Sequence, residues 1–331
     1  MTAMRLGQPL ETGPATRTHL SLRVVTLHWE AAGIVSVVLA SADRAPLPAW
    51  TPGAHVDVEL APGLVRQYSL SGDPADRSSY RITVALDRGG RGGSRHVHER
   101  LRVGEILQVS EPRSTFPYVD APCYVFLAGG IGITPLLPMM RRATAEGRPW
   151  ELYLAVRSRD AVPFRDELGG AGDGRGAVHV FASDEGRRLD LRDAVARAHP
   201  SAAVYCCGPE RMLVEVERHA RELGHEVRVE RFQAKPLSEP LRQGAFVVRC
   251  ARSQRSVTVE PDQSVLDALV GAGVGVPSSC REGVCGTCEV AVLSGAADHR
   301  DSILTDAEKQ ANETMMVCVS RALTEELELD V

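Results

Sequence analysis

The segment Cys280-Arg281-Glu282-Gly283-Val284-Cys285-Gly286-Thr287-Cys288 places three thiols in one short stretch, and a fourth thiol, Cys318, follows far downstream. The gaps between successive cysteines are four, two and twenty-nine residues. Thiolates are soft ligands that bind iron and zinc in proteins. The small residues between them allow backbone amides to turn toward bound sulfur atoms. The segment therefore predicts a metal or iron–sulfur centre.

The spacing of the four cysteines is that of a plant-type [2Fe–2S] site, in which one loop supplies three thiolates and a later strand the fourth. A structural zinc site is the alternative, but zinc usually takes two knuckle-like pairs of ligands. Disulfides require an oxidising compartment, which the rest of the sequence does not indicate. We expect the cluster to be bound by Cys280, Cys285, Cys288 and Cys318.

Composition indicates an ordinary globular protein. The chain has 331 residues, of which 44% are hydrophobic and 24% charged, and its net charge is −5. This length predicts two or three domains, and the absence of a basic block argues against a nucleic-acid partner. Residues 1–20 contain no apolar signal-peptide core, and no apolar run approaches the ~20 residues of a membrane helix. We therefore expect a cytoplasmic protein without membrane attachment, whose remaining four cysteines are reduced.

The first third of the sequence predicts an antiparallel β-barrel. From His19 onward, short alternating runs such as 34–39 and 55–60 are separated by the turn signals Pro52-Gly53 and Pro62-Gly63. Two further stretches could bind a cofactor. Arg66-Gln67-Tyr68-Ser69 offers a cation, an aromatic ring and a hydroxyl, and the glycine run that ends at Ser94 could present amides to a phosphate. Each is weak alone, because such loops are more often simple turns.

The middle of the chain predicts a parallel, doubly wound α/β sheet. The apolar run 124–128 is typical of a buried parallel strand, and further strands near 151–156, 178–182 and 203–207 alternate with helices near 161–168, 191–198 and 210–223. Ligands bind at the carboxyl ends of such strands. We expect Thr134 to cap the helix that Pro135 opens, after the loop Gly129–Ile133, and its amides to bind a pyrophosphate. Pro135 stands where the third glycine of G-x-G-x-x-G would be, so this is not the dinucleotide fingerprint.

The C-terminal segment predicts a small α+β (β-grasp) fold. A polar, proline-containing linker at 233–243 precedes strands near 245–250 and 256–260, and Ser264 is expected to cap a helix that ends near Gly271. Strands near 289–293, 315–319 and 327–331 complete a mixed sheet.

Five motifs in one order resemble the phthalate dioxygenase reductase and vanillate O-demethylase reductase family. They are Arg66-x-Tyr68-Ser69, Arg91-Gly92-Gly93-Ser94, Ala128–Pro135, Cys206-Cys207-Gly208-Pro209 and the C-terminal cysteine set. The resemblance runs from about residue 18 to the end. It implies a lead-in at 1–17, an FMN-binding barrel at 18–119, an NAD-binding domain at 120–232, the linker at 233–243 and a plant-type ferredoxin domain at 244–331.

The resemblance also implies a flavin site. In relatives with this domain order the flavin is FMN, whereas FAD would place the protein in a sister group. Arg66 would bind the phosphate, Tyr68 would pack on the isoalloxazine, and Ser69 would act catalytically near N5. The full set is Arg66, Gln67, Tyr68, Ser69, Thr83, Val84, Ala85, Arg91, Gly92, Gly93, Ser94, Thr134 and Phe232. Family members can carry a lysine where this chain has Ala85, and its loss weakens the phosphate assignment unless Arg66 and Arg91 suffice.

The nicotinamide site follows by the same comparison. The residues implied are Gly130, Gly132, Pro135, Arg157, Cys207, Gly208 and Pro209, with Cys207 near the reactive ring. Asp184 follows the strand 178–182, where its carboxylate could meet a ribose hydroxyl and repel a 2′-phosphate. The nearby Arg159, Arg187 and Arg188 argue for NADPH instead. Cys207 alone would more often be a small buried core residue.

Together these features predict a monomeric reductase that takes electrons from NADH through FMN and [2Fe–2S] to the oxygenase of a Rieske non-haem iron system. A reductase for a cytochrome P450, or an electron-carrier module without its own NADH oxidation, is the alternative. Acidic residues in or after the cysteine loop are candidates for docking a basic partner, although exposed charges usually only face solvent. They are Glu282, Glu289, Asp298 and Asp301.

Overall fold

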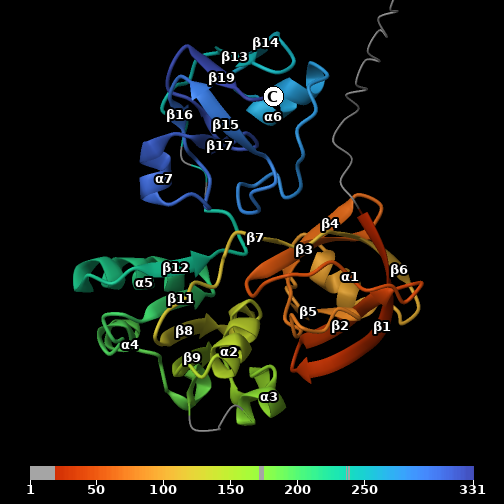
Figure 1. Cartoon of the computed structure of the whole chain (residues 1–331), viewed down its shortest axis with the longest axis vertical. Helices are drawn as coiled ribbons and strands as arrows, with labels where there is room; N and C mark the ends of the chain where they lie inside the picture. The colour runs from red at the N-terminus through yellow and green to blue at the C-terminus, as the bar shows by residue number, and fades with distance from the viewer. Residues whose placement is uncertain (1–18, 171–174, 236, 238) are drawn as a thin grey trace, which may run out of the picture. The chain divides into compact units, whose positions relative to one another are not determined.

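A computed structural model describes residues 19–170, 175–235, 237 and 239–331 (Figure 1). The predicted lead-in at 1–17 therefore lies outside the described residues. The chain divides into two compact units, one spanning His19–Pro236 and the other including Leu237–Val331. Each is described by itself.

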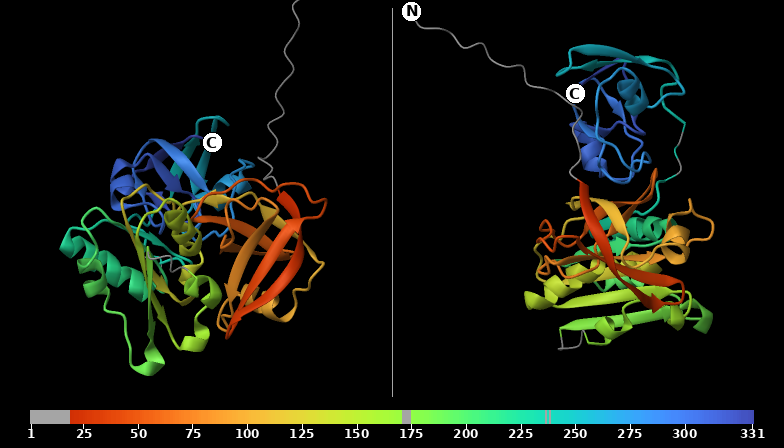
Figure 2. Two further views of the ribbon diagram at one scale, coloured as in Figure 1. Left: turned by 60° about the horizontal axis from the view of Figure 1, so that its bottom comes forward. Right: turned by 90° about the vertical axis from the view of Figure 1, so that its right-hand side faces the viewer.

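The first unit begins with the predicted antiparallel barrel (Figures 1 and 2, red to orange). The strands follow the order β4-β3-β6-β1-β2-β5, and β7 pairs with β3. An isolated bridge between Leu70 and Ile82 closes the circle. Alternation of apolar and polar residues turns one face of each strand into the barrel core. The elements are β1 (His19–Ala31), β2 (Ile34–Ser41), β3 (Ala54–Ala61), β4 (Leu64–Ser69), β5 (Ser79–Ala85), α1 (Gly93–Glu99), β6 (Ile106–Ser110) and β7 (Arg113–Ser114).

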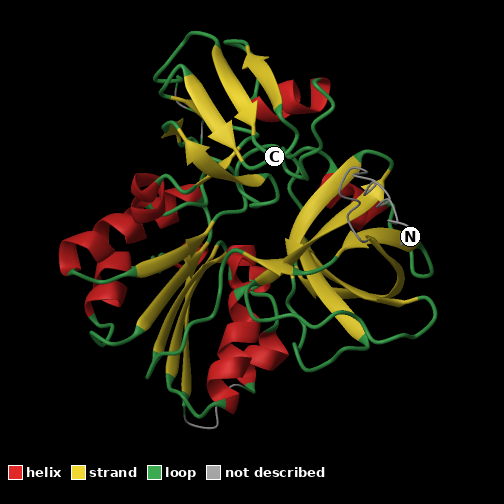
Figure 3. Cartoon of the chain, turned by 45° about the horizontal axis from the view of Figure 1, so that its top comes forward, coloured by secondary structure: helices red, strands yellow, loops and turns green. Residues whose placement is uncertain are grey.

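The second part of this unit is the predicted doubly wound sheet, whose five strands are all parallel in the order β10-β9-β8-β11-β12. Helices α2 and α3 cover one face and α4 and α5 the other, as Figure 3 shows in red against the yellow strands. The elements are β8 (Tyr124–Gly129), the 3₁₀ turn η1 (Gly130–Ile133), α2 (Leu136–Ala145), β9 (Trp150–Val156), η2 (Arg159–Ala161), α3 (Arg165–Gly169), β10 (Gly176–Ala182), η3 (Ser183–Glu185), α4 (Leu191–Ala196), β11 (Ala203–Cys207), α5 (Glu210–Leu223) and β12 (Val227–Glu230).

One predicted helix of this sheet is wrong. The expected helix at 161–168 is split into η2 and α3, because Pro163 disfavours helical geometry at the residue before it. Val162 is accordingly extended, and Phe164 takes a left-handed conformation with φ of 56°.

The second unit is a mixed sheet of order β14-β13-β19-β15-β17 with α6 against it. The Ser264 hydroxyl accepts a hydrogen bond of 3.0 Å from the Asp267 amide, which confirms the predicted cap of α6. The expected strand at 315–319 ends early, at Met316, and Cys318 lies in a turn. The elements are β13 (Phe246–Cys250), β14 (Arg255–Val259), α6 (Val265–Gly271), β15 (Glu289–Ser294), β16 (Ala297–Asp298), α7 (Asp306–Ala311), β17 (Thr314–Met316), β18 (Arg321–Ala322) and β19 (Glu326–Leu329). The three folds confirm the predicted multidomain fold class.

Candidate functional site

The cysteine loop joins α6 to β15 and brings its thiols together in two pairs. The thiols of Cys280 and Cys285 are close enough to shift each other's pKa, and so are those of Cys288 and Cys318. The contact between the two thiols lowers the pKa of Cys285 to about 5 and raises that of Cys280. The Glu282 amide also points at sulfur, with its nitrogen 3.3 Å from the Cys280 Sγ.

The loop has the left-handed backbone that its glycines allow. Gly283 has φ of 72°, and a Cβ atom built on it would lie 2.6 Å from the Val319 side chain and 3.1 Å from the Asp301 backbone. The carbonyl of Gly283 accepts a hydrogen bond of 2.9 Å from the Ser302 amide. Any side chain at position 283 would therefore push the loop away from the segment that leads to Cys318.

The paired thiols fit a binuclear cluster. A [2Fe–2S] cluster takes four cysteines, two for each iron, whereas zinc needs its ligands around one point. Among the described residues, no three or more His, Cys, Asp or Glu side chains are grouped to hold a single ion. The amide that faces sulfur is the outer-shell contact such clusters use to tune their potential.

Two of the acidic residues considered for partner docking are buried instead. Asp298 accepts a hydrogen bond from the Leu241 amide, and Asp301 accepts bonds from the Ile303 and Leu304 amides. Both side chains are structural parts of this unit, since they are shielded from solvent. Their prediction as docking residues was wrong.

The proposed flavin site lies where the barrel is incompletely closed. In the described chain, β4 and β5 share only the bridge at Leu70 and Ile82, so their edges over Arg66–Tyr68 and Thr83–Ala85 have no strand partner on that side. Helix α1 lies near both strands. The Val84 carbonyl lies 3.0 Å from the His98 Nε2 atom of that helix. Backbone N–H and C=O groups along such an edge can bind the polar rim of a planar ligand.

Arg66 reaches from β4 to the glycine-rich loop. Its guanidinium donates hydrogen bonds to the Val65 and Arg91 carbonyls. A Cβ atom on Gly93 would lie 2.4 Å from the Arg66 side chain, so only glycine lets the arginine lie there. The structure thus brings Arg66, Arg91, Gly92 and Gly93 together, as the motif predicted.

Strand alternation separates the other members of the β4 motif. Arg66 and Tyr68 share one face, while Gln67 and Ser69 lie on the other, opposite Asp57 and His55. The Gln67 amide contacts the Asp57 carboxylate at 3.4 Å. Gln67 can therefore meet a flavin on the Tyr68 face only through its backbone. His55 is not part of the motif. Its burial, and to a lesser extent the charge of Arg113, lowers its pKa to about 3, so its imidazole is neutral.

Three other predicted flavin residues use their side chains elsewhere. The Thr83 hydroxyl lies 2.7 Å from that of Ser36 and 3.0 Å from that of Ser71 inside the barrel. The Ser94 hydroxyl binds the backbone of Asp87, and the Val84 side chain is in the core. Only backbone atoms of these residues can contribute to a flavin site, whereas Ala85 is half-buried at the end of β5.

The two glycine loops at the carboxyl ends of β8 and β11 pack backbone against backbone. A Cβ atom on Gly132 would lie 2.1 Å from the Cys207 carbonyl oxygen, and one on Gly129 would lie 2.4 Å from the Pro209 ring. They border a pocket of about 270 Å³ that Phe232 and Gly208 also line. Because β8 and β11 are where the strand order reverses, this is the expected ligand crevice of a doubly wound sheet.

The start of α2 differs from the prediction. Thr134 does not cap the helix, because its hydroxyl donates to the Ile131 carbonyl at 3.0 Å and its side chain is buried. Gly130–Ile133 forms a 3₁₀ turn, and Pro135 occupies the N-cap position of α2. The amides that could face an anion are therefore those of the turn, where Gly130 has φ of 55°.

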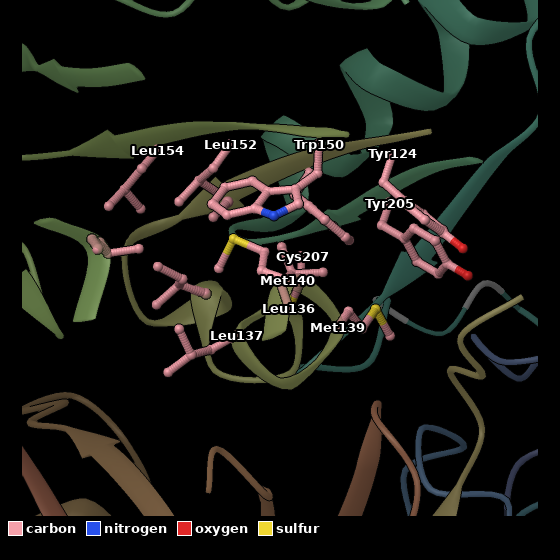
Figure 4. Packing of buried hydrophobic residues seen from close by; sticks show 14 of the residues in the cluster. Tyr124, Leu136, Leu137, Met139, Met140, Trp150, Leu152, Leu154, Tyr205 and Cys207 are labelled. Atoms are coloured by element: carbon pink, nitrogen blue, oxygen red, sulfur yellow. The ribbon is translucent and has the colours of Figure 1, made fainter. Parts of the chain in front are cut away.

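Cys207 ends β11 in the core that α2 covers, close to Leu136 and Met140 (Figure 4). Burial raises the pKa of its thiol well above the ordinary value, and the charge of Glu230 adds to the effect. The thiol is thus neutral and does not line the pocket. Only the Cys207 backbone borders the glycine turn.

Glu230 is a residue that the motifs missed. It lies beside Cys207 in the β11–β12 ladder, and its Oε2 atom is buried with no hydrogen-bond partner among the described residues. Desolvation raises the pKa of this carboxyl to about 8. A carboxylate at the carboxyl end of a strand of the parallel sheet was the available signal. Glu230 directly precedes Arg231 and Phe232, which line the pocket, and an orphaned polar atom there fits a bound nucleotide or flavin.

Arg157 and Asp184 lie at the carboxyl ends of β9 and β10, on the same edge of the sheet. The Asp184 amide donates to the Arg157 carbonyl at 3.0 Å, and both side chains are exposed. Arg159, which argued for NADPH, forms an ion pair of 2.7 Å with Glu185.

Comparison with known proteins identifies two family models. Residues 126–218 match an oxidoreductase NAD-binding domain, and residues 248–323 match a 2Fe-2S iron-sulfur cluster binding domain. Phenoxybenzoate dioxygenase subunit beta of Ectopseudomonas oleovorans is 44% identical over 96% of this chain and 99% of its own length. Vanillate O-demethylase oxidoreductase of a Pseudomonas species is 40% identical over 90% of this chain and 95% of its own.

Two solved structures are also similar to this chain. Phthalate dioxygenase reductase matches 95% of this chain and 98% of its own, with 37% identity and a TM-score of 0.66. An intact type IV self-sufficient cytochrome P450 monooxygenase matches 98% of this chain with 39% identity and a TM-score of 0.89, but this chain spans only 43% of that protein.

The fold and the comparisons define an NADH-dependent flavin and iron–sulfur electron-transfer oxidoreductase. The chain belongs to the phthalate dioxygenase reductase and vanillate O-demethylase reductase family, and its cofactors are FMN, [2Fe–2S] and NADH. Among the described residues, none of the helices has the length and apolar character needed to span a membrane.

Proposed function

We propose that this chain is the reductase of a Rieske-type oxygenase. The observation that carries the proposal is that this chain matches 99% of the length of a dioxygenase subunit. The chain also has an open barrel edge, a nucleotide crevice and paired thiols. The flavin couples a donor of electron pairs to a cluster that takes single electrons. The protein supplies binding, orientation and control of potential.

The geometry supports the proposed flavin and cluster sites. Arg66, with Arg91 and Gly93, would hold the FMN phosphate, and Tyr68 would pack on the ring. Burial raises the pKa of Tyr68, so its phenol is neutral there. Cys280, Cys285, Cys288 and Cys318 would bind the cluster.

The nicotinamide nucleotide would lie along the carboxyl edge of the parallel sheet. Gly130, Gly132, Gly208 and Pro209 would line its path, and Asp184 would meet the ribose. The barrel, nucleotide and ferredoxin domains would span 18–119, 120–232 and 244–331, in a monomer. Size-exclusion chromatography with light scattering tests the monomer.

Anaerobic titration with NADH tests the electron path. Both flavin and iron–sulfur absorption should bleach, and FMN, iron and sulfide should be recovered in the ratio of one to two to two, as a plant-type cluster requires. Flavin that does not bleach would refute the proposal.

A cytochrome P450 is the second candidate acceptor, because the P450 monooxygenase structure contains a region similar to this whole chain. The two candidates separate in a coupled assay. The purified chain and NADH are supplied to a Rieske-type oxygenase or to a P450, and product formed by only one identifies the acceptor class.

A further inference from the structure

Three charged side chains connect the barrel to the helices of the parallel sheet within the first unit. Glu167 on α3 forms an ion pair of 2.6 Å with Arg81 on β5, and it also pairs with Arg141 on α2. All three side chains are at most about one-third exposed. Burial raises the pKa of Glu167, but the hydrogen bonds and charges of the two arginines outweigh it and hold the pKa below the ordinary value. Glu167 is therefore ionised at neutral pH.

Both arginines also hold one backbone group, the carbonyl of Ser71. Arg81 donates to it at 2.7 Å and Arg141 at 3.1 Å. The Ser71 amide in turn donates to the Arg81 carbonyl at 2.8 Å. Charge-assisted bonds of this kind are about twice as strong as neutral ones. Ser71 is thereby fixed two residues beyond Ser69, at the end of the proposed flavin strand.

The other end of the cluster lies next to the nucleotide crevice. Arg141 is on α2, the helix that directly follows the glycine turn Gly130–Ile133. One side chain thus links the helix behind the crevice to the end of the flavin strand. The Arg81 guanidinium lies 5.0 Å from the ring centre of Phe164, the buried residue whose positive φ is unusual for a bulky side chain.

We propose that Glu167, Arg81 and Arg141 are positioning residues that set the distance between the flavin and the nicotinamide. The proposal rests on the flavin and nucleotide sites proposed above. Two sheets that hold two reactants need a fixed separation, and a misplacement of about 1 Å can cost about a hundredfold in rate. Glu167 is the only member of the three whose charge binds both arginines, so its neutralisation should loosen both contacts.

The test compares Glu167→Gln with Glu222→Gln in the flavin- and cluster-loaded chain. Glu222 is the matched control, because it forms an exposed pair of 2.9 Å with Arg218 on α5, where ion pairs contribute little. Stopped-flow mixing with NADH gives the limiting rate of flavin bleaching and the dissociation constant of NADH. Hydrogen exchange of peptides covering 70–73 reports the hold on Ser71 independently of activity.

For Glu167→Gln we expect the limiting rate to fall about tenfold or more and exchange at 70–73 to rise, while the dissociation constant of NADH changes by less than about threefold. Flavin content and the cluster spectrum should match the parent. The Arg141 guanidinium uses Nη1 for the Ser71 and Gly72 carbonyls and Nη2 for Glu167. Arg141→Lys keeps the charge but replaces this fork with a single nitrogen atom, so its rate should lie between those of Glu167→Gln and the parent. If Glu167→Gln does not fold, Arg141→Lys serves as the test.

Limiting rates within about twofold of the Glu222→Gln control would overturn the proposal, as would unchanged exchange at 70–73. A rate loss that only matched lost flavin would also overturn it. Failure of the proposed function would give a different result, because the flavin of the parent chain itself would not bleach with NADH.

Discussion

Replacing Glu230 with glutamine should make the fold more stable at alkaline pH. The Oε2 atom of Glu230 is buried without a partner, and its carboxyl has a pKa of about 8 against an ordinary 4.5. The folded state therefore keeps a proton that the unfolded chain loses as the pH rises. Unfolding free energy falls between these two values by ~1.4 kcal/mol per pH unit. Over this range the loss amounts to about 5 kcal/mol, which is an upper limit because part of the residue reaches solvent.

Glutamine has no proton to lose, so Glu230→Gln should match the parent below pH 4.5 and exceed it by several kcal/mol above pH 8. Denaturant unfolding of the loaded chain, followed by circular dichroism at a series of pH values, measures the difference. Glu226→Gln is the control, since Glu226 precedes the same strand, is exposed to solvent and pairs with Arg228. An unfolding free-energy difference between Glu230→Gln and the parent that stayed constant across this pH range would show that the carboxyl is solvated or partnered.

Three further substitutions test the proposed sites. Gly132→Ala places a Cβ atom 2.1 Å from the Cys207 carbonyl oxygen, so NADH-dependent flavin bleaching should slow at least about tenfold in stopped flow while both cofactors remain bound. Bleaching at the parent rate would contradict the assignment of this crevice as the nucleotide site. Arg66→Gln removes charged bonds worth ~1.5–3 kcal/mol, so the dissociation constant of FMN should rise about tenfold to a hundredfold in a fluorescence titration; unaltered FMN affinity would remove Arg66 from the site. Cys318→Ser should abolish the iron–sulfur absorption and cytochrome c reduction but keep NADH–ferricyanide activity through the flavin; retention of the cluster spectrum would exclude Cys318 as a ligand.

The periodicity of apolar residues along the chain and the spacing of the cysteines predicted the fold well. The alternation in the first third of the chain gave the barrel, and the apolar runs before the glycine loops gave the parallel strands. The spacing of the cysteine loop predicted that its thiols would lie close together, and the glycines at 283 and 286 allow the left-handed backbone that the loop adopts.

Side-chain partners were harder to predict, because they depend on residues distant in sequence. Thr134 has the residue type of a helix cap, yet a carbonyl three residues earlier captured its hydroxyl. Asp301 has the residue type of a surface charge. It is buried instead, because nearby backbone amides donate hydrogen bonds to its carboxylate. The Oε2 atom of Glu230 lacks a hydrogen-bond partner among the described residues because of the side chains that surround it in the folded sheet, and no local sequence pattern predicts those neighbours.

The incomplete seam between β4 and β5 also bears on how the protein matures in the cell. Two strand edges that share only a single bridge are templates for association between chains. A ligand that fills the seam would act as a staple during biogenesis. With the flavin bound as proposed, the yield of soluble reductase should follow riboflavin supply, and cells starved of the vitamin would accumulate aggregated chains.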